Sequence, residues 1–167
     1  RMINTYSLFA VNVIHGKFIL PINMHRKIIK FVDENYKVSD YTRSCVDGFQ
    51  THDDFDGKKE LIKKFNLYLN SMFQLNIEYG WLNVLGKNSS NNPHKHDGLN
   101  ITYSGVLYLS SENNNITFVK DDKIFEIKPK LFDYLIFPSN LVHYVLAEER
   151  DKKRICYAFN LSIIGEE

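Results

Sequence analysis

The feature that most constrains the fold is a series of short β-type segments in the second half of the chain. Seven apolar or alternating runs, separated by turn-rich pieces, fill about 90 residues. They are Glu78–Gly86, Ile101–Ser110, Asn115–Val119, Lys123–Ile127, Tyr134–Phe137, Leu141–Leu146 and Arg154–Ile163. This spacing leaves no room for the helices that connect parallel strands, so we expect mainly antiparallel sheets. The natural closure is a double-stranded β-helix, the jelly-roll or cupin-like barrel.

Two amphipathic helices are expected before this barrel. Apolar residues recur at helical spacing over about Ile22–Tyr36 and over Lys58–Phe73. A single strand over Tyr6–Val13, closed by a turn around Gly16, precedes them, and residues 37–55 between them are polar and irregular. The helices are therefore expected to pack on the outside of one sheet.

Composition and length limit the class of protein. The chain has 21 basic and 20 acidic residues and a net charge of +1, which argues against nucleic acid or a membrane surface as partner. No apolar run approaches ~20 residues, and Cys45 and Cys156 are too few for a disulfide framework, so we expect a cytoplasmic protein. We expect one domain over 1–167, with a strand and two supporting helices in 1–77 and the barrel core in 78–164. A homodimer is compatible with the sequence.

The last segment, Arg154–Ile163, has two different faces when it is extended. One face carries Arg154, Cys156, Ala158 and Asn160, and the other carries Ile155, Tyr157, Phe159 and Leu161. Small residues around a single guanidinium are typical of a strand that lines a ligand cavity, whereas the bulky face suits packing against the helices. The same alternation places Ser104 and Tyr108 together as hydroxyl donors toward that cavity.

Histidines form the candidate metal site. His94 and His96 lie two residues apart, so their imidazoles share one face of an extended strand and can converge on one ion. His143 is a distant third, and Arg154 follows one strand later. Two complete ligand sets remain: the three histidines, or a set in which Asp97, in a turn-prone Asp-Gly pair, replaces one of the neighbouring two. A third arrangement has two protein ligands and a water molecule.

Several pieces of the second half resemble the Fe(II)/2-oxoglutarate-dependent oxygenases, a family with a double-stranded β-helix fold. They are Trp81-Leu82-Asn83 leading into Asn92-Pro93-His94-Lys95-His96, then Ser104–Leu109, Phe137–His143 and Arg154–Asn160. The resemblance implies a hydroxylase that uses Fe(II) and converts 2-oxoglutarate to succinate and carbon dioxide. Most members of the broader superfamily have His-x-Asp or His-x-Glu, whereas this chain has His96 at that second position.

The resemblance also implies roles for individual residues. His143 would be the distal iron ligand, and Arg154 would pair with the 5-carboxylate of 2-oxoglutarate. Ser104 and Tyr108 would assist at that carboxylate, and Asn83 would line the pocket. The arginine has independent physical support, because a planar guanidinium matches a carboxylate through two parallel hydrogen bonds.

Two other functions share some of these features. A cupin-like metalloenzyme that does not use 2-oxoglutarate would keep the metal site, but it would not explain Arg154 among small residues. A non-catalytic jelly-roll module would use the barrel mouth to bind protein or sugar, but burying three imidazoles together without a metal would be costly. The sequence does not distinguish a small-molecule substrate from a peptide side chain.

Overall fold

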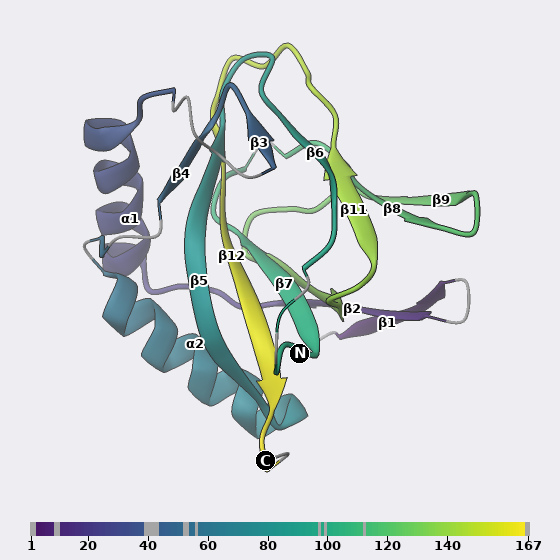
Figure 1. Ribbon diagram of the computed structural model, residues 1–167. Helices are drawn as coiled ribbons and strands as arrows, with labels where there is room; N and C mark the ends of the chain where they lie inside the picture. Colours follow the sequence, from purple (N-terminus) through teal and green to yellow (C-terminus); the bar gives the residue numbers. More distant parts are fainter. Residues whose placement is uncertain are drawn as a thin grey trace.

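Two antiparallel sheets face each other in the computed structural model of the chain, and both helices lie outside the larger sheet (Figure 1). The structure describes residues 3–8, 11–38, 44–51, 54–55, 57–96, 98, 100–111 and 113–165. The elements are β1 (Asn4–Leu8), β2 (Val11–Lys17), α1 (Ile22–Asn35), β3 (Cys45–Val46), β4 (Phe49–Thr51), α2 (Lys58–Phe73), β5 (Leu75–Leu85), β6 (Ser90–His94), β7 (Tyr103–Tyr108), β8 (Ile116–Lys120), β9 (Lys123–Ile127), β10 (Asp133–Pro138), β11 (Val142–Val145) and β12 (Arg154–Ile163).

The strand order gives the jelly-roll architecture that the strand spacing predicts. The larger sheet has the order β1-β2-β10-β7-β12-β5-β4, and the smaller sheet has the order β3-β6-β11-β8-β9. Most neighbouring strands are not consecutive in the sequence, the exceptions being β1–β2, β4–β5 and β8–β9, and every described pair is antiparallel. Within the described residues the two sheets stay separate ladders, so the barrel is an open sandwich of two sheets.

The inner faces of the two sheets share one apolar cluster. The larger sheet contributes residues such as Val106, Leu135 and Cys156, and the smaller sheet contributes residues such as Phe118 and Val145. Because inward residues alternate with outward ones along each strand, this cluster leaves the opposite face of the larger sheet for the helices.

Both helices bury one stripe of residues on that outer face. The buried residues are Met24, Ile28 and Val32 in α1 and Leu61, Phe65 and Leu69 in α2. A spacing of four places each set on a single side of its helix. The stripes pack against the bulky face of β12, including Tyr157 and Phe159, as the alternation of that strand predicts. Neither helix in the described ranges is long and apolar enough to cross a membrane.

The prediction of one strand over Tyr6–Val13 is wrong. Two strands, β1 and β2, pair antiparallel with Leu8 opposite Val11. Gly16 lies inside β2 and forms no turn. A Cβ atom added there would lie 2.3 Å from the Tyr134 hydroxyl, so this glycine accommodates a buried ring. The described part of residues 1–77 thus contributes β1 to β4 and the start of β5 to the sheets, where one strand was expected.

The structure also contains strands in stretches that were expected to be irregular. The short strands β3 and β4 lie within residues 37–55, and β6 lies outside the seven runs that were expected to be strands. The β6 sequence is polar and contains Pro93, so propensity alone does not predict a strand there. Pairing with β11 determines it, and this pairing places His94 directly opposite His143.

We expect the substitution Phe65→Ala to lower the free energy of unfolding by about 3–5 kcal/mol, because it leaves a cavity between α2 and the larger sheet. Phe65 is fully buried, and its ring centroid lies 4.7 Å from that of Phe18 and 5.2 Å from that of Phe159. Urea unfolding measures the change. Leu67→Ala is the control, because Leu67 on the same helix is 63% exposed and its loss should change stability by less than about 0.5 kcal/mol. Equal effects of the two substitutions would contradict this packing.

Candidate functional site

Three imidazoles from separate parts of the chain meet between the two sheets. His143 on β11 is buried and pairs in register with His94 at the end of β6. His96 follows β6, where its backbone N–H donates to the carbonyl oxygen of Ser139 at 2.8 Å. One ring nitrogen of each histidine lies within 4.8 Å of those of the other two. Because metal–imidazole bonds are about 2.1 Å long, a small movement of the rings would let one ion contact all three.

The hydrogen bonds of the rings determine which nitrogen carries the proton. Each Nδ1 atom lies at hydrogen-bonding distance from an oxygen: His94 from the Asn92 carbonyl (2.7 Å), His143 from the Leu141 carbonyl (2.9 Å) and His96 from Oδ1 of Asn160 (2.7 Å). An Nδ1–H donor in each ring puts the lone pair on Nε2, the form in which imidazole binds a metal.

Burial keeps two of these histidines neutral. It lowers the pKa of His143 well below the usual value, and the nearby rings of His94 and His96 lower it further. Burial also lowers the pKa of His94. Neutral imidazoles at pH 7 are ready to bind a cation. Asp97 lies outside the described residues, so the ligand set that uses it stays an alternative prediction.

Arg154 lies in the same cavity and has no acidic partner among the described residues. Its side chain is 1% exposed, one N–H contacts the Cys156 sulfur at 3.5 Å, and its Nε atom is buried without a hydrogen-bond partner. The guanidinium carbon lies 5.1 Å from the ring centroid of Tyr108, whose hydroxyl is also buried without a partner. Burial raises the pKa of that phenol, so it stays protonated and can donate. A guanidinium with no acidic partner among the described residues, beside a buried hydroxyl that can donate, fits an anionic ligand such as a carboxylate.

Amide side chains form another part of the cavity wall, and Asn83 is among them. Gln50 donates to Oδ1 of Asn83 (3.2 Å), Asn83 donates to Oδ1 of Asn91 (3.0 Å), and Asn91 donates to the Ser44 hydroxyl (3.3 Å). This chain of hydrogen bonds joins β4 and β5 of the larger sheet to β6 of the smaller one. It therefore fixes the spacing of the sheets beside Arg154.

Ser104 occupies a different place from the one that the sequence suggested. Its hydroxyl donates to Oδ1 of Asn160 at 2.8 Å, and Ser104 is not among the residues that line the cavity. Its contact with a cosubstrate carboxylate stays a prediction. Sequence reasoning gave neither Asn160 nor Trp81 a role at the metal site, yet both contact His96. The signal for Asn160 was one amide on the inner face of the otherwise apolar run from Ile155 to Leu161.

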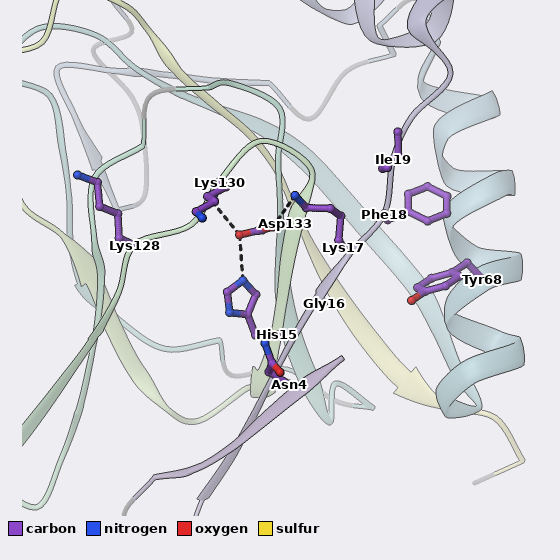
Figure 2. Close-up of a pocket in the computed structure, with 10 residues that line it drawn as sticks. All are labelled: Asn4, His15, Gly16, Lys17, Phe18, Ile19, Tyr68, Lys128, Lys130 and Asp133. Carbon is purple, nitrogen blue, oxygen red and sulfur yellow. Dashed lines mark hydrogen bonds and ion pairs between the residues drawn. The ribbon is translucent and has the colours of Figure 1, made fainter. Parts of the chain in front are cut away.

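A second, larger cavity of about 720 Å³ opens beside β2 and the start of β10 (Figure 2). At its centre, Asp133 accepts hydrogen bonds from His15 Nε2 (3.0 Å) and the backbone N–H of Lys130 (2.8 Å), and Lys17 Nζ lies 3.7 Å from it. This carboxylate is thus satisfied by its own neighbours. Within the described residues, the three histidines form the one group that could hold a metal ion, so the smaller cavity is the candidate site.

Comparisons with known proteins identify a family match and similar folds. Residues 112–160 match a family described as "Putative 2OG-Fe(II) oxygenase". A search of curated proteins gives no match. Among solved structures, a prolyl-4-hydroxylase of Pseudomonas putida superposes with a TM-score of 0.63 at 14% identity, covering 92% of this chain and 93% of that one.

Two further structures contain ligands according to their descriptions. A viral collagen prolyl hydroxylase of Paramecium Bursaria Chlorella virus-1, in complex with 2OG, matches with a TM-score of 0.60 at 15% identity, covering 90% of this chain and 96% of that one. HygX from Streptomyces hygroscopicus, with nickel and 2-oxoglutarate bound, matches with a TM-score of 0.62 at 10% identity, covering 92% and 83%. At such low identity these structures establish the fold.

We expect the free energy of unfolding of the metal-free protein to fall as the pH is lowered below about 6.5. The lowered pKa of His143 means that the unfolded state takes up a proton that the native state does not, so stability rises with pH in this range. His143→Gln removes this titration and should make the fall shallower, by at most about 1.4 kcal/mol per pH unit. Urea unfolding in a chelator between pH 5 and 7.5 compares the two proteins. Identical pH dependences would show that His143 is not buried as a neutral ring.

Proposed function

We propose that this chain, a member of the 2-oxoglutarate- and Fe(II)-dependent oxygenase family, is a hydroxylase that holds its iron through His94, His96 and His143. The observation that carries the proposal is that three imidazoles and the guanidinium of Arg154 line a single cavity. The guanidinium is buried, and its Nε atom has no hydrogen-bond partner. A metal site alone would fit many enzymes. A metal site beside a buried cation fits a reaction in which an anionic cosubstrate binds next to the metal.

The three histidines would hold the ion through their Nε2 atoms. Their Nδ1–H groups are tied to oxygen acceptors, which fixes the ring planes before any ion binds. Three protein ligands on one side leave the other side for cosubstrate and dioxygen. Fe(II) and 2-oxoglutarate, when bound, supply the oxidative chemistry: one oxygen atom of O₂ enters the substrate, the other enters succinate, and carbon dioxide leaves.

Arg154 would bind the far carboxylate of 2-oxoglutarate. Its unpaired Nε and the unpaired hydroxyl of Tyr108 are the donors that such a carboxylate would satisfy. Asn83 lines the same cavity and would contact the cosubstrate from the side. Ser104 would act at the carboxylate only after giving up its bond to Asn160, so we assign it a weaker contribution there. This buried cation also argues against a cupin-like enzyme without 2-oxoglutarate and against a binding module without chemistry.

The substrate is a small molecule or a peptide side chain. Two of the similar structures are named as prolyl hydroxylases, which supports a peptide substrate. HygX has a similar fold and is not named as a prolyl hydroxylase. The net charge of +1 supports a substrate other than nucleic acid. The low cysteine content supports a cytoplasmic location, and a homodimer remains compatible with the proposal.

We expect the purified protein to release succinate from 2-oxoglutarate when Fe(II) and O₂ are supplied, even without its substrate. His143→Ala should abolish this turnover and the binding of iron, because it removes a buried ligand. His25→Ala is the control, since His25 bonds to the Leu109 carbonyl outside the site, and it should keep turnover. Unchanged iron content in His143→Ala would remove the ligand assignment, and no succinate from the loaded wild-type protein would remove the oxygenase.

We expect Arg154→Ala to weaken 2-oxoglutarate binding by more than roughly tenfold, because a hydrogen bond to a charged group contributes on the order of 1.5–3 kcal/mol. Calorimetry with the metal-loaded protein under anaerobic conditions measures the affinity. Arg154→Lys keeps the charge but lacks the planar guanidinium, so its affinity for 2-oxoglutarate should lie between those of the wild type and Arg154→Ala. Equal affinity in wild type and Arg154→Ala would rule out a carboxylate clamp at this residue.

A further inference from the structure

We propose that Asn160 is a positioning residue for the third metal ligand, His96, and that Ser104 and Trp81 complete the support that sets the plane and tautomer of this ring. The inference rests on the proposed metal site. In that site, the neutral amide of Asn160 accepts a hydrogen bond from the Nδ1–H group of His96, so that Nε2 of His96 faces the ion.

His96 needs such support because of its place in the chain. His94 and His143 bond to carbonyl groups two residues before them, Asn92 and Leu141, so their rings are oriented by their own strands. His96 lies beyond the end of β6, and its Nδ1 partner comes from β12, a different sheet. The orientation of one ligand therefore depends on a tertiary contact.

Two donors converge on a single atom of Asn160. Oδ1 of this residue lies 2.7 Å from His96 Nδ1 and 2.8 Å from the Ser104 hydroxyl, and both Asn160 and Ser104 are 1% exposed. The two amide orientations have different consequences. With oxygen in this position, His96 carries its proton on Nδ1. With the NH₂ group there, the amide would donate to Nδ1 and move the proton to Nε2, where it would block the metal. In the structure, the Ser104 hydroxyl donates to the same oxygen atom and adds a second hydrogen bond to the first orientation.

Aromatic rings hold the plane of His96 from one side. The centroid of Trp81 lies 5.6 Å from that of His96 with an interplanar angle of 20°. Tyr79 stacks behind Trp81 at 5.9 Å and 24°. Both residues point from β5, which pairs with β12 in a register that places Tyr79 opposite Asn160. The stacked rings and the hydrogen bond thus come from adjacent strands. Together they restrain the orientation of the His96 ring.

The experiment uses Co(II) as the probe and proton NMR as the readout. In the Co(II)-loaded wild-type protein, we expect three strongly shifted, solvent-exchangeable ring resonances, one from each Nδ1–H group. Asn160→Leu, of similar volume, should remove one of the three through fast exchange and lower Co(II) affinity by about 10–100-fold. Ser104→Ala should retain three resonances but speed the exchange of the same one. Asn114→Leu is the matched control, because Asn114 is a buried amide bonded to the Leu146 carbonyl and should leave all three unchanged.

The outcomes separate this inference from the proposed function. Failure of the wild type to bind Co(II) would overturn the metal site itself, and with it the inference. Three resonances in Asn160→Leu, with unchanged exchange and affinity, would overturn the role of Asn160 and leave the metal site standing. Two resonances in the wild type that both persist unchanged in Asn160→Leu would show that Asn160 does not hold an Nδ1–H group of a metal-bound His96, and would overturn the inference. If Asn160→Leu does not fold by circular dichroism, Asn160→Asp replaces it. A charged acceptor should slow the exchange of the affected proton, and wild-type exchange there would overturn the proposal.

Discussion

The alternation of side chains between the two faces of β12 is the constraint on which the rest of the molecule depends. Arg154, Cys156 and Ala158 line the cavity, Asn160 on the same face contacts His96, and residues of odd number from Ile155 to Leu161 face the helices. A slip of one residue in the pairing with β5 and β7 would turn the arginine and the asparagine into the helix-facing core and expose bulky side chains to the cavity. The hydrophobic contacts of α1 and α2 therefore fix the register that brings the polar groups of the site together.

Electrostatics explain why this site suits an anionic cosubstrate. The proposed ligand set consists of neutral imidazoles, and the guanidinium of Arg154 has no carboxylate beside it among the described residues. A divalent ion would thus add to a positive charge that is already buried, and desolvation makes both charges costly without a counter-ion. A dianion that bridges the ion and the guanidinium offsets both costs at once. A carboxylate in place of one imidazole would reduce the positive charge and with it part of this attraction.

The sequence predicted the parts of this structure whose signal is periodic. The helix Lys58–Phe73 and the two faces of β12 follow from spacing alone, because apolar residues recur at helical spacing in the first and bulky residues alternate with smaller ones in the second. The strand β6 does not follow from spacing, because its polar residues are extended only through pairing with β11. The hairpin of β1 and β2 was missed because no turn residue marks it, and Gly16 was misread because its role lies in contact with Tyr134.

The candidate site divides in the same way. The histidines and Arg154 stood out because their chemistry is rare in a buried strand, whereas the roles of Asn160 and Trp81 depend on distances between strands that spacing along the chain does not encode. β12 carries both Arg154, the proposed anchor for the cosubstrate, and Asn160, the acceptor for His96, six residues apart on one face. A shift of this strand against β5 would move both together. Phe159, next to Asn160, packs against Phe65 of α2, so the outer core determines the geometry of the metal site through a single strand.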